Sequence, residues 1–363
     1  MAEKASPHCI DIKITLDFVN ALIRGAMPNL LITSFFEIAT GWNNKAVKVE
    51  TSDGQQFVLR LSRAASWPPS KVEAEAAALR IAAENSIPAP QLVTFGVQTP
   101  NASTETASDI SKVHWMLLEY IEGNMLEAVW RELSIIEKND LLVEIKRVIV
   151  KLQASTFNEI GGLGFNSSSN RPIVTKYWDG EFIYDSEPSF LIGRLNQNLC
   201  DLQSIEVLPG FQTEFDTLIK RLDDVRSIIN SVFRSLKPCP TVLFHGDFAF
   251  RNIMVRRNES RKLVISSILD WEWCGTRPIY VDWLDDWLEE ENDGDVYENK
   301  WIRQQIMKDG FPCFENLEGY VIRSTLYALV VDSIAKWRFE GNQFENAINR
   351  VKKHFDKLDI LLD

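Results

Sequence analysis

Two apolar segments in the last third of the chain carry polar residues at their ends, and this pattern restricts the fold more than any other feature of the sequence. The first segment, LFHGDFAFRNIMV over 243–255, contains Asp247 and Asn252, and the second, VISSILDWEW over 264–273, contains Asp270. Both segments read as β-strands, and a buried carboxylate is tolerated mainly when it is paired or holds a metal. We therefore expect neighbouring strands that bring the three polar groups to one point.

The three polar side chains have the chemistry of a magnesium site beside a general base. Magnesium takes oxygen ligands, keeps several waters, and commonly uses one or two carboxylates together with substrate phosphates. With Asn252 and Asp270 as ligands, Asp247 would be free to orient a hydroxyl and accept its proton. The alternative is a strand–loop–strand in which these residues only cap the turns. Each residue alone favours that alternative, whereas their joint order and spacing favour a site.

HGDFAFRN followed by ILDWEW resembles the catalytic and metal-binding motifs of the aminoglycoside phosphotransferase and choline kinase-like family, which is related to the protein kinases. Protein kinases carry H-R-D-x-x-x-x-N and D-F-G for the same tasks. Here Gly246 replaces the Arg, and Asp270-Trp271-Glu272 stands where D-F-G would. The resemblance extends over about residues 35–290. It implies that Asp247 is the catalytic base, that Asn252 and Asp270 bind Mg²⁺, that Glu272 stands behind these ligands without binding the metal, and that ATP is the phosphate donor.

The texture of the chain changes near Gly123, from strand-like runs to long helices. The first third contains β-rich runs, two of them joined by a predicted hairpin at Asp53-Gly54. With the resemblance, this change implies an α+β, protein-kinase-like two-lobed fold with a cleft between the lobes. The expected parts are a small antiparallel-sheet N-terminal lobe over 1–118, a hinge over 119–123, and a larger, mainly helical C-terminal lobe over 124–363.

Four segments read as helices. SKVEAEAAALRIAAEN over 70–85 is rich in Ala and Glu, and the prolines that follow it end the helix. A second helix begins with Ser134 and Glu137 at capping-box spacing. Further helices are expected near 212–235 and over 317–339.

The resemblance also selects a charged pair in the small lobe. Arg60 in FVLRLSR stands where the family carries the basic residue that pairs with phosphate, and a guanidinium can clamp phosphate with two N–H donors. Lys48 on the preceding strand is the alternative. The expected acidic partner is Glu75, which shares a helix face with Leu79, whereas Glu73 is expected to face water.

The nucleotide-binding segments are less distinctive. TGWNNKAVKV contains a single glycine, so a phosphate loop here would depend on the backbone amides of Asn43 and Asn44. LLEYIEG matches the family's connector between lobes. By that match the carbonyl of Glu119 and the N–H of Ile121 would meet adenine, and Leu118 would line the back of the pocket.

The acceptor site is the least determined part of the sequence. Glu272 and an acidic, Trp-rich segment that includes Asp282, Trp283 and Asp286 could hold a cationic substrate through charge and cation–π contact. The alternative, a helix with one solvated acidic face and Trp residues in the core, is favoured by the residues alone. YWDGEFIY over 177–184 is a second candidate. The partner is therefore expected to be a small-molecule hydroxyl acceptor of unspecified identity.

Composition narrows the class of protein. A chain of 363 residues with 45% hydrophobic residues can bury a large core, and a net charge of −12 argues against nucleic acid as the main partner. Five dispersed cysteines without a CxxC pair favour reduced thiols and a cytoplasmic location. The N-terminus lacks the apolar core of a signal peptide, and no run is long enough to span a membrane. The sequence leaves the oligomeric state open.

The sequence allows three alternatives to an aminoglycoside phosphotransferase-like activity. Choline or ethanolamine kinase activity would use the acidic and aromatic segments to hold a quaternary ammonium or amine. A pseudokinase, which binds ATP without turnover, is suggested by Arg60 and the glycine-poor loop, but the complete Asp247, Asn252 and Asp270 set argues more strongly for turnover. Protein-kinase activity is disfavoured because no clear counterpart of the A-P-E segment is present.

Overall fold

The structure is a computed structural model that describes residues 14–40, 44–63, 69–98, 113–177, 182–281 and 317–363. The chain forms two compact units. The first unit comprises Met1–Ser155, Gly162–Phe182 and His245–Gly275, and the second comprises Thr156–Gly161, Ile183–Phe244 and Thr276–Asp363.

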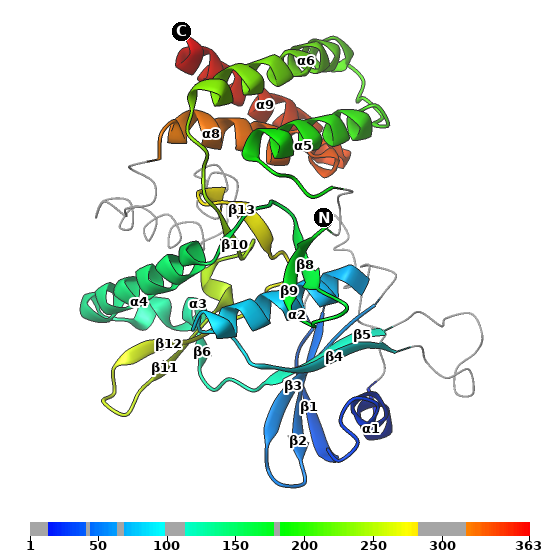
Figure 1. The fold of residues 1–363 in the computed structure, drawn as a ribbon, viewed down its shortest axis with the longest axis vertical. Coiled ribbons are helices and arrows are strands. Elements are labelled where there is room, and N and C mark those ends of the chain that lie inside the picture. Colours follow the sequence, from blue (N-terminus) through cyan, green and yellow to red (C-terminus); the bar gives the residue numbers. More distant parts are fainter. Residues whose placement is uncertain (1–13, 41–43, 64–68, 99–112, 178–181, 282–316) are drawn as a thin grey trace, which may run out of the picture. The chain divides into compact units, whose positions relative to one another are not determined.

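The first unit is built around a five-stranded antiparallel sheet of order β1-β2-β3-β5-β4 (Figure 1). Its strands are β1 Ile32–Thr40, β2 Lys45–Thr51, β3 Gln56–Arg63, β4 Leu92–Gln98 and β5 Val113–Glu119. The predicted hairpin joins β2 to β3. Its Gly54 has a φ of +81°, a conformation that glycine adopts without strain. The sheet predicted for this part of the chain is confirmed.

The two faces of the β2–β3 hairpin pack against different parts of the first unit. Val47, Val49, Leu59 and Leu61 are fully buried and form a core with helix α1 Leu16–Arg24. Because side chains alternate along a strand, the intervening residues face the other side of the sheet. The sequence did not predict α1, which begins at Thr15, whose hydroxyl accepts a hydrogen bond from the Phe18 N–H.

Helix α2, Pro69–Glu84, packs against β4 and β5 of the sheet and against β8 (Figure 1). Its buried face carries a run of alanines, Ala76–Ala78, which allows the helix backbone to approach its neighbours closely. Its predicted extent is confirmed. The helix carries Glu75, so its close packing fixes where that carboxylate lies.

The rest of the first unit contains a second, smaller sheet, and helix α4 contacts β12 of that sheet. The order in this sheet is β12-β11-β6. At the start of α4 the predicted capping box forms, because Ser134 and Glu137 each accept a hydrogen bond from the other's backbone N–H. The remaining elements of the unit are β6 Asn124–Met125, α3 Leu126–Val129, η1 Trp130–Glu132, α4 Ile135–Ala154, β8 Gly162–Phe165, β9 Pro172–Thr175, η2 Phe250–Asn252, β11 Ile253–Arg257 and β12 Leu263–Ile268.

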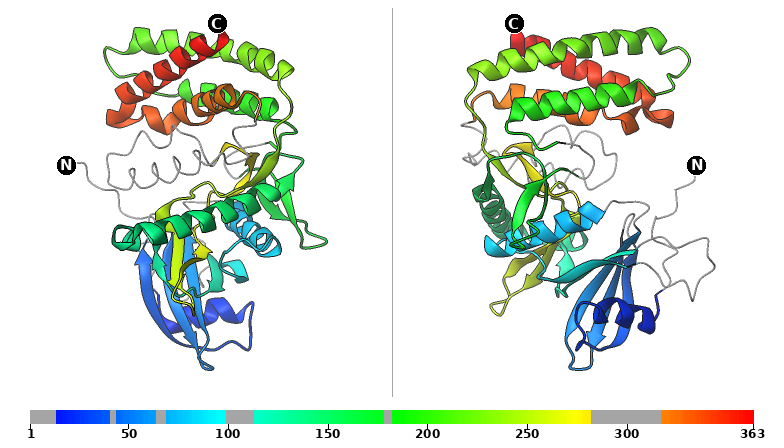
Figure 2. Two further views of the ribbon diagram at one scale, coloured as in Figure 1. Left: turned by 90° about the vertical axis from the view of Figure 1, so that its left-hand side faces the viewer. Right: turned by 45° about the vertical axis from the view of Figure 1, so that its right-hand side comes forward.

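The second unit is mainly helical, with α5, α6, α8 and α9 packed together (Figure 2). The helix expected near 212–235 is confirmed as α6. The helical structure expected over 317–339 is confirmed, although it is not one regular helix: α8 passes into a π-helix and then a 3₁₀ turn. The elements are β7 Thr156–Phe157, α5 Glu187–Leu202, α6 Gln212–Ser235, β10 Thr241–Phe244, β13 Gly275–Pro278, α8 Tyr320–Tyr327, π-helix η5 Ala328–Ser333, η6 Lys336–Phe339, η7 Gly341–Gln343 and α9 Phe344–Leu362.

The predicted α+β class is confirmed. The lobe boundaries predicted at 118 and 124 fall within the first unit, and the division into 1–118, 119–123 and 124–363 stays a prediction. Among the helices of the described ranges, none has both the length and the apolar character needed to span a membrane.

Candidate active site

His245 fixes the backbone on which Asp247 lies. The imidazole is completely buried; its Nε2 lies 3.0 Å from the carbonyl oxygen of Leu269, and the Asp247 N–H donates to its Nδ1 at 3.2 Å. These two bonds require the proton on Nε2. Burial lowers the pKa of His245 to about 4, so the ring is neutral near pH 7. A neutral ring therefore joins the segment of Asp247 to the segment of Asp270.

The backbone conformations of this region explain two residue choices. Gly246 has a φ of +87°, and a Cβ there would lie 2.5 Å from the Cβ of Trp273, so a larger residue does not fit. Asp270 has a φ of 64°, in the left-handed region that Asp tolerates better than most residues. Both residues mark tight turns at which the two motif segments approach each other.

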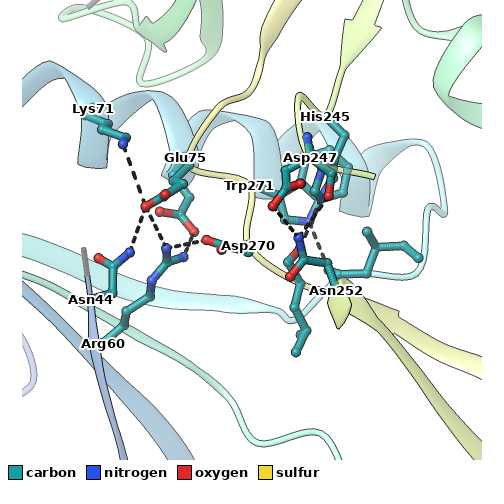
Figure 3. Close-up of polar contacts among 12 residues, drawn as sticks. Asn44, Arg60, Lys71, Glu75, His245, Asp247, Asn252, Asp270 and Trp271 are labelled. Carbon is teal, nitrogen blue, oxygen red and sulfur yellow. Dashed lines mark hydrogen bonds and ion pairs between the residues drawn. The ribbon is translucent and has the colours of Figure 1, made fainter. Parts of the chain in front are cut away.

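Asp247 and Asn252 form a hydrogen-bonded pair (Figure 3). The amide nitrogen of Asn252 donates to Oδ2 of Asp247 at 2.8 Å and to its backbone oxygen at 2.9 Å. With the nitrogen committed to Asp247, the amide oxygen of Asn252 is the atom available to a cation. Oδ1 of Asp247 pairs with Arg251, which lies four residues along the chain.

Arg60 on β3 is the centre of a buried ionic cluster (Figure 3). Its guanidinium pairs with Glu75 on α2, with Oδ1 of Asp270 at 2.5 Å, and with Oε2 of Glu272 at 3.3 Å. The two carboxylates after β12 therefore meet the basic residue of β3 and the acidic residue of α2. These are the residues that the sequence selected for the phosphate-binding pair and the metal motif.

Glu272 gathers further donors around itself. Oε2 accepts a hydrogen bond from the side-chain amide of Asn44 at 2.7 Å and lies 3.7 Å from Nζ of Lys71. The same ammonium lies 4.1 Å from the ring centre of Trp273, within the range of a cation–π contact. Glu272 thus connects the residue before β2, the strand β3 and the helix α2.

The cluster shifts the proton affinities of its members. Burial raises the pKa of Glu75 to about 7; the Arg60 charge opposes this effect, while Asp270 and Glu272 add to it. Burial works against the charge of Arg60, but the surrounding carboxylates outweigh it and raise its pKa above the ordinary value. Burial lowers the pKa of Lys71 to about 8, with Glu272 opposing. Burial, assisted by the neighbouring carboxylates, therefore makes Glu75 easier to protonate than an ordinary glutamate.

A cavity of about 550 Å³ in the first unit is lined both by Arg60, Glu75, Asp270 and Glu272 of this cluster and by the connector. Its wall includes Arg60, Asn252 and Asp270, and also Leu118, Glu119 and Ile121 of LLEYIEG. Apolar side chains on several elements complete the wall: Ile38, Ala46, Val58, Leu79, Pro90, Met125, Met254 and Leu269. A polar end next to a long apolar wall is the form expected of a site for a nucleotide's phosphates and base.

The donors at the polar end fit magnesium. Asn252 and Asp270 offer one amide oxygen and one carboxylate, which suits a hard cation that keeps waters and also binds substrate phosphates. Within the described ranges, no group of three or more His, Cys, Asp or Glu side chains forms a metal cage. A metal here would depend on the phosphates of its ligand for the remaining coordination.

The structure separates the rival residues weighed from the sequence. Lys48 stands over the ring of Tyr120 at 4.0 Å, whereas Arg60 contacts Glu75 and lines the cavity. Glu75 is buried in the cluster. Glu73, expected to face water, is half-buried, and its carboxylate accepts a hydrogen bond from the Phe165 N–H at 3.2 Å.

Several predicted residues fall outside the described part of the chain: Asn43, Asp282, Trp283 and Asp286. Residues 178–181 of the second aromatic candidate lie outside it as well. The acceptor predictions on these residues stay predictions.

Two residues of the site did not emerge from the sequence reasoning. Lys71 lies one helical turn before Glu75 in SKVEAEAAALR, and Arg251 lies four residues after Asp247. In both cases an oppositely charged pair at a spacing of four was the available signal. That spacing is common on protein surfaces, so it does not identify a site without the fold.

The sequence and the fold were compared with known proteins. A model of the phosphotransferase enzyme family matches residues 35–309, which is about three quarters of the chain. A curated relative, the altered inheritance of mitochondria protein 9, mitochondrial, of Debaryomyces hansenii, is 27% identical over 188 residues. This match covers 46% of the present chain and 29% of the relative, so the chain spans less than a third of the relative's length.

Among solved structures, a thermostable mutant of aminoglycoside phosphotransferase APH(4)-Ia in ternary complex with ADP and hygromycin B superimposes with a TM-score of 0.55. The identity is 13%, and the match covers 93% of this chain and 98% of that one. A protein assigned as a fructosamine-3-kinase from Thermobifida fusca YX-ER1 gives a TM-score of 0.55 at 12% identity, with coverage of 93% and 98%. These matches confirm the predicted protein-kinase-like, two-lobed fold.

Proposed function

The chain belongs to the phosphotransferase enzyme family, and from this premise we propose that it transfers the γ-phosphate of ATP, in the presence of Mg²⁺, to a hydroxyl group of a small molecule. The family match supports the predicted enzyme class, a phosphotransferase. The nucleotide, the metal and the acceptor are the proposed parts.

One observation carries the proposal of ATP and magnesium. A single cavity is lined at one end by Arg60, Asn252 and Asp270 and elsewhere by the connector residues Glu119 and Ile121. Phosphates at the charged end and adenine against the connector backbone would use both parts of the wall. The solved relative with ADP bound supports the same class of ligand.

We assign the roles in the transfer as follows. Asp247 accepts the proton of the acceptor hydroxyl, because its carboxylate is held in place by Asn252 and its backbone by His245. Arg60, held by Glu75, neutralises phosphate oxygens. Mg²⁺ held by Asn252 and Asp270 would supply further neutralisation of the phosphates. Phosphoryl transfer needs little covalent work from the protein, so positioning and charge account for the catalysis.

Glu272 was expected either behind the metal ligands or among the acceptor-binding candidates. Its carboxylate contacts Arg60, Asn44 and Lys71. These contacts favour a role beside the phosphates. Asn44, which precedes β2, is joined to the phosphate side through the same carboxylate. Asn43 stays a prediction as a phosphate-loop residue.

The acceptor is proposed to be a hydroxylated and preferably cationic small molecule. Hygromycin B is bound by one structural relative and fructosamine is the named substrate class of another, and both are polyhydroxylated amines. Choline and ethanolamine remain rival acceptors. The cytoplasmic location inferred from the sequence stays a prediction beside the mitochondrial name of the curated relative.

An acceptor screen with coupled detection of ADP tests the proposal. Wild-type protein with Mg²⁺ and ATP should release ADP faster when its acceptor is present, and the panel should include aminoglycosides, amine-modified sugars, choline and ethanolamine. Asp247→Asn should lower turnover by roughly 10²–10⁴-fold, the usual contribution of a positioned acid–base group. Calorimetry with Mg·ATP is the control, because this variant should keep nucleotide affinity.

Two results would contradict the proposal. Turnover close to wild type in Asp247→Asn would exclude this residue as the base. Slow ADP release that no acceptor accelerates, with intact Mg·ATP binding, would instead identify an ATP-binding protein without transfer activity.

A further inference from the structure

Lys71 is a buried cation whose contacts lie on the segment that follows Asp270. Its side chain is 4% exposed, its ammonium lies 3.7 Å from Oε2 of Glu272, and the ring centre of Trp273 is 4.1 Å away. Removing an ammonium from water is costly, so a lysine is kept in such a position only when its contacts compensate for the lost hydration. Here the compensation comes from the two residues nearest the end of the metal motif.

The positive charge of Arg60 alone does not neutralise the carboxylates of the cluster. Three carboxylates, on Glu75, Asp270 and Glu272, contact this one guanidinium. Lys71 supplies a second positive charge, and it contacts Glu272. With all three carboxylates ionised, as they are above pH 7, and with Glu75 assigned to Arg60 and Glu272 to Lys71, Asp270 is the carboxylate in excess.

Exposure agrees with this assignment. The side chain of Asp270 is 36% exposed, whereas those of Glu75 and Glu272 are 7% and 8% exposed. The excess charge therefore lies on the carboxylate that a cation from solvent can reach. Among the described residues, the two inner carboxylates contact Arg60 and Lys71.

We propose that Lys71 is a positioning residue for nucleotide binding: by holding Glu272, it leaves Arg60 able to exchange Asp270 for the phosphates of the nucleotide. This inference rests on the proposed function and extends it to a residue outside the family motifs quoted above. Lys71 does not contact the nucleotide in this arrangement. It acts through Glu272 and Arg60.

The physical reason is competition for one guanidinium. Without Lys71, Arg60 is the cation left for three carboxylates among the described residues of the cluster, and two of these carboxylates are less than 10% exposed, so its N–H donors are drawn to Glu272. Phosphates must then compete with an additional buried anion. Burial lowers the pKa of Lys71 to about 8, which still leaves most of the ammonium charged at pH 7.

Calorimetry on the full chain tests the proposal with two ligands, Mg·ATP and adenosine. Lys71→Met should weaken Mg·ATP binding by about 10–100-fold, the range that corresponds to losing part of one charged contact. Adenosine has no phosphates for Arg60 to bind, so its affinity should change by less than about twofold. In steady-state assays the KM for ATP should rise while kcat stays within about threefold.

The double variant Lys71→Met/Glu272→Gln separates positioning from simple structural damage. Neutralising Glu272 removes the anion that Lys71 holds, so Mg·ATP affinity should return to within about threefold of that of Glu272→Gln alone. Should Lys71→Met not fold, the comparison of these two variants still decides the matter. Lys138→Met is the control, because Lys138 also stands over an aromatic ring, that of Trp130, but lies on α4, whereas Lys71 lies on α2 beside Glu272.

Unchanged Mg·ATP affinity in Lys71→Met would overturn the inference, as would an equal loss of adenosine and Mg·ATP affinity. A loss of more than tenfold between Glu272→Gln and the double variant would also overturn it. A wild-type protein that binds no Mg·ATP would instead refute the proposed function on which the inference rests.

Discussion

Two arginines, one in each unit, lie against carboxylates with side chains that are 1% and 13% exposed, and they are neutralised in different ways. Arg323 on α8 pairs with Glu187, while its other donors reach the backbone oxygens of Glu318 at 2.8 Å and of Lys237 at 2.5 Å. The second carboxylate oxygen of Glu187 accepts a hydrogen bond from the hydroxyl of Tyr280 at 2.5 Å. One positive charge thus meets one negative charge, and neutral partners take the remaining hydrogen bonds.

Arg60 in the first unit meets three carboxylates instead of one. Even with Lys71 included, the cluster keeps one excess negative charge, and this charge lies in the wall of a cavity. A balanced pair such as Arg323–Glu187 holds the chain together without any ligand. The excess negative charge of an unbalanced cluster is neutralised when a cation or a proton binds. Such a cluster in the wall of a cavity indicates a binding site.

The largest effect expected from this difference follows removal of a carboxylate from the balanced pair. Glu187→Gln leaves the buried Arg323 charge without its counterion, which should lower the free energy of unfolding by about 3–5 kcal/mol. Glu272→Gln removes a carboxylate from the unbalanced cluster and should cost less than about 1 kcal/mol. Urea unfolding followed by circular dichroism measures both changes. Equal losses in the two variants would show that charge balance does not distinguish the clusters.

The contrast also shows what the sequence could give. Asp247, Asn252 and Asp270 were found because three polar residues interrupt two strand-like runs, and such interruptions are costly unless they serve a purpose. The small antiparallel sheet and α2 followed from β-rich runs, a turn at Asp53-Gly54 and helix-ending prolines. These signals depend on residues that are close in the sequence, so they can be recognised without the fold.

Other parts of the site depend on contacts between residues far apart in the sequence. Lys71 meets Glu272 across about 200 positions, and no spacing rule predicts such a pair. The π-helix after α8 likewise breaks a stretch whose composition favours a regular helix, since packing decides there over propensity. Helix α1 was not predicted, although Thr15 caps it and one of its faces is apolar.

A pH dependence of stability is the second expected consequence of the excess charge. Burial raises the pKa of Glu75 from its ordinary 4.5 to about 7, so between these values the folded protein keeps a proton that the unfolded chain has released. The stabilising contribution of this group is fully present below pH 4.5 and is lost as the pH rises towards 7. It amounts to about 3 kcal/mol at most.

The wild type minus Glu75→Gln difference in unfolding free energy isolates this group, because other titrating residues are common to both proteins. That difference should fall as the pH rises from 4.5 to 7, in urea titrations at several pH values. A difference that is constant over the window would mean that Glu75 is ionised throughout and that Arg60 fully compensates its burial.

The smallest effect, and the one with the most informative sign, is expected at Asp270. Asp270→Asn removes the excess charge and keeps the shape of the side chain, so it should raise the free energy of unfolding by about 1 kcal/mol, as replacements at strained functional positions often do. The same variant should lose most of its Mg²⁺-dependent ATP affinity in calorimetry, because one of the two proposed metal ligands is gone. Since Asp270 also has a left-handed backbone, which Asn tolerates equally well, the change in stability reports on charge. The opposite result would be a variant that is destabilised and still binds Mg·ATP normally. In that case Asp270 would serve, as Glu187 does, as the counterion of a structural ion pair. The clusters of Arg60 and Arg323 would then not differ in kind.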